Sequence, residues 1–340
     1  MNKKTSLLVF WTGALLFSTL ACGTATSLSD RSSSPAVSAT AESRTLDPAV
    51  SASCGSLLNQ IVSAATTAGS YAEPEQERHL VTYKVDGEEI TDPQFEAIPA
   101  DLQNVQQDLA TQHRTWDYFT ALIPQEERAM VSTYSVITDG DANLLSAVAQ
   151  TPADPTHWAL EVDIADSADY NNLTFTLIHE FGHLLTLNAD QVPPSQGIFS
   201  RSEAGKVHDL EVSLCPNYFP GEGCSRPDSY INQFYQRFWV NIYGEWNEID
   251  QIEDDGVYYE KLNQFHSKYQ DQFVTDYAAT NPGEDIAESW AYFVLTPKPD
   301  GDTIAEQKVL FFHKYPALVE LRANVLSRLC TSFPSPYGTE

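Results

Sequence analysis

The chain is poor in basic residues, and this shortage excludes one class of partner. Of its 340 residues, 19 are Lys or Arg and 47 are Asp or Glu, so the formal net charge at pH 7 is −28. Such a charge repels the phosphates of nucleic acids, and we expect no nucleic-acid partner. The acidic residues are dispersed along the chain, which favours a well-solvated folded surface over a disordered acidic tail. We expect a monomer.

Cys-x-x-Cys pairs are absent, which argues against a cysteine zinc site and against a thioredoxin-type redox site. The cysteines present are Cys22, Cys54, Cys215, Cys224 and Cys330. If Cys22 carries a lipid, an even number remains, as is usual in exported proteins with disulfides. Cys215 and Cys224 bracket a short loop with proline and glycine, so we expect them to pair. Cys54 would then pair with Cys330.

Long apolar runs are scarce, and the one near the N-terminus has the features of an export signal. Residues 6–20 are apolar, follow two lysines and precede small residues, which predicts a signal peptide over residues 1–21. The run is too short to be a good membrane span. Thr19-Leu20-Ala21-Cys22 resembles the lipobox of bacterial lipoproteins, with Thr19 where leucine is usual. We expect export to the cell surface with a lipid on Cys22 as the only membrane contact. The alternative is plain secretion.

Composition and periodicity divide the remainder of the chain. Residues 22–53 are rich in Ser, Ala and Thr and predict a flexible tether. We expect an N-terminal part of the folded region at 54–125 and a main region at 126–340, with a disulfide-containing insertion at about 190–275. Predicted helices cover 57–68, 101–122 and 309–329, the last broken at Pro316, and predicted strands cover 80–85, 130–137 and 158–164.

Two segments, 158–164 and 230–242, could have either a functional or a purely structural role. Along 158–164, large apolar residues alternate with small or acidic ones, so one face of the strand is expected to be apolar. This strand is either an edge to which an extended substrate adds or an ordinary strand of the sheet. Aromatic residues recur at helical spacing over 230–242, and we interpret them as core rather than as a binding surface.

A His-Glu-x-x-His motif, His179-Glu180-Phe181-Gly182-His183, lies in a stretch that predicts a buried helix. Apolar residues recur around it at spacings of three and four. On a helix, His179 and His183 share one face and can offer two imidazole nitrogens to one metal ion. Glu180 lies beside that face and can take a proton from a water molecule. Because such groups are costly to bury without partners, the pattern favours a zinc site over surface histidines on a structural helix.

The third zinc ligand decides the class of site. One large class extends the motif with a glycine, a third histidine and a later methionine turn. Here Thr186 and Ala189 occupy the first two positions, and both methionines, Met1 and Met130, precede the motif, so that class is excluded.

The other class takes a glutamate from a later helix. The segment 281–293 predicts such a helix, because Asn281 is a good N-cap and Pro282 a good first residue. Glu284 and Glu288 lie four residues apart on one face. One carboxylate can bind zinc while the other accepts a hydrogen bond from a liganding histidine. The alternative is a capping box, in which Glu284 only bonds the backbone of Asn281.

The motif together with the later Glu-x-x-x-Glu resembles the gluzincins, and within them the peptidases related to anthrax lethal factor and the Pro-Pro endopeptidases. In that group a tyrosine lies seven residues before the liganding glutamate, as Tyr277 does before Glu284. Residues 274–285 are also similar to a family of bacterial zinc-metallopeptidase lipoproteins. The gap of about a hundred residues between His183 and Glu284 is longer than in compact members. No Pro-Pro preference is carried over.

This resemblance implies an α+β, zincin-like fold: a small mixed sheet with an edge strand over the motif helix, and a mainly helical C-terminal part. Residues 126–340 would be its catalytic region. The resemblance also implies roles for individual residues: His179, His183 and Glu284 as ligands of one Zn²⁺, Glu180 as general base, Tyr277 as oxyanion donor and Glu288 as partner of a liganding histidine.

The expected activity is zinc-dependent hydrolysis of peptide bonds, by an endopeptidase acting on a peptide or protein at or outside the bacterial cell surface. One alternative is a non-catalytic, surface-anchored binding lipoprotein with a structural zinc, for which His208 and His266 are candidates for a fourth ligand. A second is an aminopeptidase, which needs an acidic anchor that no short motif supplies. Glu253-Asp254-Asp255 is interpreted as a solvated loop rather than a calcium site.

Overall fold

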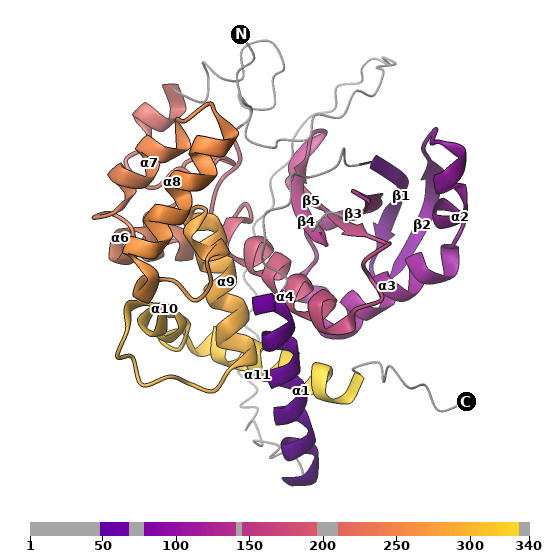
Figure 1. The fold of residues 1–340 in the computed structure, drawn as a ribbon. Helices are drawn as coiled ribbons and strands as arrows, with labels where there is room; N and C mark the ends of the chain where they lie inside the picture. Colours follow the sequence, from indigo (N-terminus) through magenta and orange to yellow (C-terminus); the bar gives the residue numbers. More distant parts are fainter. Residues whose placement is uncertain (1–47, 68–77, 141–144, 196–209, 333–340) are drawn as a thin grey trace, which may run out of the picture.

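The computed structural model describes residues 48–67, 78–140, 145–195 and 210–332. The predicted signal peptide, Cys22, the tether up to residue 47 and His208 lie outside these residues. The described chain is α+β, with one five-stranded mixed sheet. Figure 1 shows the sheet on one side, a group of helices on the other, and the motif helix between them.

The sheet combines parallel and antiparallel neighbours in the order β2-β1-β3-β5-β4. Only β3 and β5 are parallel; the other neighbours are antiparallel. Because β1 pairs with β3, one sheet contains residues from both sides of position 125. The strands are β1 (Arg78–Asp86), β2 (Glu89–Phe95), β3 (Val131–Thr138), β4 (Ser146–Thr151) and β5 (Asp154–Asp163).

The strand expected at 158–164 is present as β5, but the interpretation of that strand as the edge is wrong. Val162 pairs with Val136 of β3 on one side and with Ser146 of β4 on the other, so β5 is interior. Its acidic face is also inside, since Glu161 and Asp163 are buried. The edge next to β5 is β4, whose sequence of small residues did not predict a strand.

The helices agree with the predicted ones in position but differ at their ends. Helix α1 (Pro48–Thr67) begins within the predicted tether, and it packs against the motif helix. The helix expected over 101–122 is broken into a 3₁₀ turn (Ala100–Leu102), α2 (Gln103–Gln106) and α3 (Leu109–Leu122). Helix α3 starts afresh because the Asp108 side chain accepts from the Thr111 backbone N–H. Pro316 separates α10 (Ile304–Phe312) from α11 (Pro316–Ser332), as expected.

The described part of the predicted insertion combines the Cys215–Cys224 loop with packed helices. It contains α6 (Tyr230–Phe238), α7 (Tyr243–Asp250) and α8 (Asp255–Lys268). Trp239 is fully buried and donates from Nε1 to Asp285 Oδ2 at 2.6 Å. Lys308 Nζ pairs with the same oxygen at 2.5 Å. These contacts confirm that most of the aromatic stripe over 230–242 is core.

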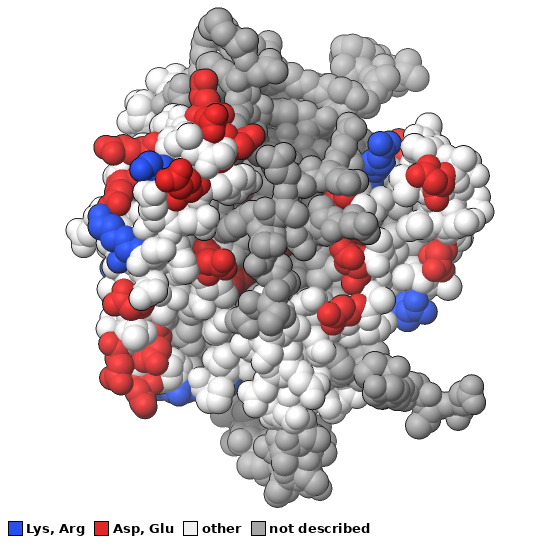
Figure 2. Space-filling model, in the orientation of Figure 1, with Lys and Arg blue, Asp and Glu red and all other residues white. Residues whose placement is uncertain are grey.

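Both cysteine pairs expected from the sequence are joined in the structure. One disulfide links Cys54 in α1 to Cys330 in α11, and the other links Cys215 to Cys224. Disulfides in a single chain indicate an extracellular or otherwise oxidising location. Among the described helices, none is long and apolar enough to cross a lipid bilayer. On the face in Figure 2, acidic side chains are spread over both the helical and the sheet sides.

Candidate metal centre

The motif lies in α4 (Tyr170–Leu187), a helix with a capped N-terminus. Asp169 accepts from the backbone N–H groups of Asn171 and Asn172, which fixes the start of the helix. The motif residues His179 and Glu180 are buried near its middle. Helix α4 contacts the edge strand β4 on one side and α9 on the other.

Helix α9 (Pro282–Leu295) approaches α4 closely because one residue there has no side chain. A Cβ on Gly182 would lie 3.0 Å from the Ala287 Cα and 3.1 Å from Trp290 Cδ1. The N-terminus of α9 is fixed by Asn281, whose Oδ1 accepts from Gly283 N at 2.8 Å and Glu284 N at 3.0 Å. The close approach brings the acidic face of α9 against the histidine face of α4.

Three ligand-type atoms from the two helices meet at one point. His179 Nε2 lies 3.1 Å from His183 Nε2 and 3.0 Å from Glu284 Oε2, and His183 Nε2 lies 3.3 Å from the same oxygen. Zinc bonds of about 2.0–2.1 Å at tetrahedral angles would separate ligand atoms by roughly 3.3 Å. The three separations therefore fit a tetrahedral zinc site with one position left over.

Hydrogen-bond chemistry also fits a cation at this point. Glu288 Oε1 lies 2.8 Å from His179 Nδ1 and accepts a hydrogen bond from its N–H group. A neutral imidazole with Nδ1–H has a bare lone pair on Nε2. That lone pair faces the carboxylate of Glu284, and two acceptors do not satisfy each other. Glu284 bonds the histidines rather than the backbone of Asn281, which is the geometry expected of a ligand and not of a capping box.

The pKa values of His179 and Glu284 are shifted in the directions that favour positive charge on the imidazole and negative charge on the carboxylate. Burial alone lowers the pKa of the His179 imidazole, but hydrogen bonds to Glu284 and Glu288 outweigh burial and raise it well above its usual value. Burial alone would raise the pKa of Glu284, but the charge of His183 and hydrogen bonds from both histidines hold it well below its usual range.

Glu180 lies under the edge strand. Its side chain is buried, and burial raises the pKa of its carboxyl to about 7, while the charges of His183 and His179 oppose that rise. The backbone of Val148 in β4 also hydrogen-bonds this carboxyl and lowers its pKa. The general-base candidate therefore lies between the histidines and the exposed edge of the sheet.

Tyr277 belongs to a 3₁₀ turn (Tyr277–Ala279) just before α9. Its ring centre lies 5.8 Å from that of His179, and 42% of the residue is exposed. Tyr277 therefore lies at the surface, next to one of the candidate ligands. The five predicted residues His179, Glu180, His183, Tyr277 and Glu284, with Glu288 behind them, are thus brought together.

Three residues near the site had no sequence signal of their own. Thr275 Oγ1 donates to Glu288 Oε2 at 2.7 Å and so fixes the carboxylate that fixes His179. Val148 reaches Glu180 through its backbone. Glu222, from the Cys215–Cys224 loop, is acted on by the charges of His183 and Glu284. Only the position of Thr275, two residues before Tyr277, could have suggested a role.

Other candidates from the sequence lie elsewhere. His266 in α8 packs against Phe273, with ring centres 6.3 Å apart, and does not join the histidine–glutamate group. Asp254 caps α8 by accepting from Val257 N at 2.9 Å, and its two acidic neighbours are exposed. This agrees with the interpretation of that segment as a solvated loop.

A second group of carboxylates, Asp139, Asp163 and Asp166, lies where the parallel strands β3 and β5 end. Asp163 Oδ2 accepts from Asp139 N and its Oδ1 from Ala165 N, both at 2.8 Å. Burial raises the pKa of Asp163 from 3.8 to about 6, against the effect of these two backbone bonds. No spacing or motif in the sequence predicted this group.

No protein-family model, curated protein or solved structure matches this chain. What the chain does is therefore inferred from the geometry of its own residues.

Proposed function

We propose that the protein is a zinc-dependent peptidase with a zincin-like catalytic region. The observation that carries the proposal is the convergence of His179 Nε2, His183 Nε2 and Glu284 Oε2 within 3.3 Å of one another. Within the described part of the chain this group holds two imidazoles and one carboxylate and no fourth protein ligand, which is the ligand set of catalytic rather than structural zinc. When bound, zinc acidifies a water molecule and polarises a carbonyl group.

The chemistry assigned to the chain's own residues is peptide hydrolysis. The Glu180 carboxylate takes a proton from the attacking water as the water oxygen bonds to the scissile carbonyl carbon. The Tyr277 hydroxyl donates to the carbonyl oxygen as that oxygen becomes anionic. When the carbon–nitrogen bond breaks, Glu180 returns the proton to the leaving amine. The products are a free carboxyl and a free amine.

The substrate is proposed to be an extended peptide lying along β4. Among the described strands, β4 pairs only with β5, and its backbone at Val148 hydrogen-bonds the Glu180 carboxyl. An extended peptide added to the free edge would carry its carbonyl groups past the general base. The oxidising location indicated by the disulfides, together with the predicted signal peptide and lipid anchor, favours peptides outside the cytoplasm as substrates.

The test combines metal analysis with cleavage of a peptide library. Purified protein loaded with zinc should hold one ion per chain and cleave library peptides. Glu180→Gln should keep the zinc and lose at least about a hundredfold in rate, because the general base is gone. Glu284→Ala should lose most of the zinc.

Each result can contradict the proposal. Unchanged cleavage by Glu180→Gln would reject the mechanism, and unchanged zinc content in Glu284→Ala would reject the ligand set. Zinc binding without any cleavage by the wild-type protein would support the binding lipoprotein instead. Glu248→Gln, which alters an acidic residue of α7, is the control variant.

A further inference from the structure

His183 has a buried nitrogen whose hydrogen bond is not accounted for. Its Nε2 faces His179 and Glu284, so the metal-binding arrangement leaves the proton on Nδ1. Among the described residues, none accepts a hydrogen bond from this buried Nδ1. For His179 the matching position is filled by Glu288 at 2.8 Å. Liganding histidines almost always donate this proton to a carboxylate, a carbonyl or water.

Glu222 has a buried acceptor oxygen, Oε2, that lacks a hydrogen-bond donor within the described part of the chain. The charges of His183 and, with opposite sign, of Glu284 act on the pKa of its carboxyl, so Glu222 lies within electrostatic range of the candidate ligands. Within the described residues, a buried donor and a buried acceptor that both lack a partner thus lie in the same region of the molecule.

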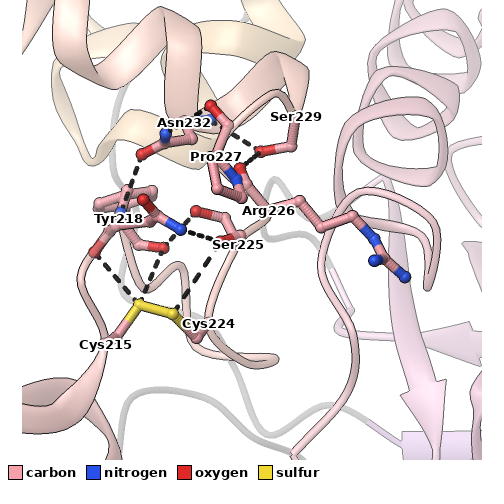
Figure 3. The surroundings of a disulfide bond; sticks show 9 residues. Cys215, Tyr218, Cys224, Ser225, Arg226, Pro227, Ser229 and Asn232 are labelled. Atoms are coloured by element: carbon pink, nitrogen blue, oxygen red, sulfur yellow. Dashed lines mark hydrogen bonds between the residues drawn. A yellow bond between two sulfur atoms is a disulfide. The ribbon is translucent and has the colours of Figure 1, made fainter.

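The loop that carries Glu222 is held firmly in place. Figure 3 shows the Cys215–Cys224 disulfide and the bonds around it. Ser225 N and Oγ both donate to the Tyr218 carbonyl, and Tyr218 N donates to Asn232 Oδ1 in α6. The Tyr218 ring stacks on Tyr235 of the same helix, with centres 4.5 Å apart.

The loop is also attached to the chain that leaves the motif helix. The Glu222 carbonyl accepts from Ser195 N at 2.8 Å, and Arg226 N donates to the Gln191 carbonyl at 2.9 Å. A Cβ on the adjacent Gly223 would lie 2.2 Å from the Pro193 carbonyl oxygen, so only glycine permits this approach. The backbone of Glu222 is therefore fixed relative to the end of α4, four residues beyond His183.

We infer that Glu222 is the positioning residue for His183. Its Oε2 accepts a hydrogen bond from His183 Nδ1–H, either directly, after a change in the Glu222 side-chain torsion angles, or through one water molecule. The two histidines would then be held by separate carboxylates, His179 by Glu288 and His183 by Glu222. This inference rests on the proposed zinc site. It assigns a function to the Cys215–Cys224 loop, which would supply the carboxylate that holds His183.

Zinc affinity tests the inference without any measurement of hydrolysis. Glu222→Met keeps the side-chain volume and removes both acceptor oxygens, whereas Glu222→Gln keeps one. Measured by competition with a chromogenic chelator, the zinc affinity of the Met variant should fall about 10- to 100-fold. The Gln variant should recover most of the loss, because an amide oxygen can still accept from Nδ1.

A second measurement detects the proton on His183 directly. In the zinc-loaded protein with ¹⁵N-labelled histidine, the Nδ1–H proton of His183 should give a downfield NMR resonance protected from exchange. This resonance should disappear in Glu222→Met, while that of His179 remains. The absence of a protected His183 resonance in the wild-type protein would overturn the inference.

The other roles open to Glu222 give different results. If Glu222 were itself a metal ligand, Glu222→Gln would lose as much affinity as Glu222→Met, and the absorption spectrum of the Co²⁺-loaded protein would change. If it anchored a substrate ammonium group, zinc affinity would be unchanged and only KM would rise. Either result rejects the inference. Failure of the wild-type protein to bind zinc would instead reject the proposed function.

Discussion

At the scale of single residues, hydrogen bonds connect one half of the candidate metal centre to the turn that precedes α9. Glu288 accepts from both His179 and Thr275, and the Thr275 hydroxyl accepts in turn from Ala278 N at 3.1 Å, in the turn that carries Tyr277. The position of Tyr277 is thereby connected to that of His179. A change at one of these residues is expected to affect the others.

Tyr277→Phe separates chemistry from metal binding. Removal of one oxyanion donor should lower kcat by roughly 10²- to 10³-fold, with zinc content unchanged, because the phenol is not one of the three proposed zinc ligands. Steady-state kinetics with a cleaved library peptide, together with elemental analysis, measures both effects. Tyr269→Phe is the matched control, since its hydroxyl donates to Glu245 on α7. A kcat equal to that of the wild type would remove Tyr277 from the mechanism.

Spacing explains which site residues could be predicted from the sequence. His179 and His183, and likewise Glu284 and Glu288, are four residues apart in one helix, so local geometry alone brings each pair to one face. Tyr277 could be predicted through the resemblance. Glu222 and Val148 come from a loop and an edge strand, and only the tertiary fold decides what their neighbours are.

At the scale of elements, the site depends on how closely α4 and α9 approach. Gly182 and Ala287 face each other there, and the absence of a side chain at Gly182 permits the contact. Glu284 and Glu288 lie on either side of Ala287 along α9. The distance between the helix axes therefore affects the positions of both carboxylates relative to the histidines.

Gly182→Val should push α4 and α9 apart and weaken zinc binding by at least about tenfold. The reason is that a displacement of α9 relative to α4 moves Glu284 and Glu288 away from the histidines. Zinc affinity by chelator competition and thermal unfolding would be measured together. Gly244→Ala, in helix α7, is the control: its Cβ would meet nothing within 4 Å. Alanine there should stabilise the protein by up to about 1 kcal/mol. Equal zinc affinity in Gly182→Val and the wild type would contradict this role of the contact.

Elements in which large apolar residues recur at regular spacing could be predicted from the sequence, and elements without that spacing could not. Helix α4 and strand β3 have many large apolar residues, and both lie close to their expected positions. Strand β4 has the sequence Ser146-Ala-Val-Ala-Gln-Thr151, and its structure comes from pairing with β5 rather than from its own side chains. The acidic residues of β5 suggested solvent on one face, but Glu161 and Asp163 are buried. Tertiary burial therefore overrode the alternation pattern.

At the scale of the whole molecule, the two disulfides are expected to have different effects. Cys54 and Cys330 are 276 residues apart in the sequence, whereas Cys215 and Cys224 are 9 apart. Cross-links that close longer loops restrict the unfolded chain more. The long-range bond should therefore contribute more to global stability, and the short-range bond to the local geometry around Glu222.

Double variants measure this division. Cys54→Ser/Cys330→Ser should lower the free energy of unfolding by roughly 2–5 kcal/mol, and Cys215→Ser/Cys224→Ser by less. If the loop fixes Glu222, the second variant should show the larger loss of zinc affinity. Urea unfolding and chelator competition on both variants provide the data. The reverse order in both measurements would contradict the expectation.

The stability of the molecule should also depend on pH through Asp163. Its pKa is about 6 in the folded protein, raised by burial from 3.8, so the folded state binds its proton more tightly than the unfolded state does. The resulting stabilisation is complete below about pH 3.8 and is lost as the pH rises through 6. Relative to Asp163→Asn, the wild-type protein should therefore gain stability as the pH falls from 7 to 5.

Urea unfolding at several pH values, with Asp117→Asn on the exposed face of α3 as control, measures this trend. A stability difference between wild type and Asp163→Asn that stays constant from pH 7 to pH 5 would show that the Asp163 carboxyl does not titrate as described.

The Cys54–Cys330 bond determines what a single proteolytic cut does to the molecule. It joins the first described helix to the last, so the chain between them is a covalently closed ring. A single cut in this ring leaves one molecule, with His179 and Glu284 still attached to each other even if the cut falls between them. Such a nicked protein would migrate as one band without reductant and as two bands with it. Clipping alone would therefore not release half of the metal centre.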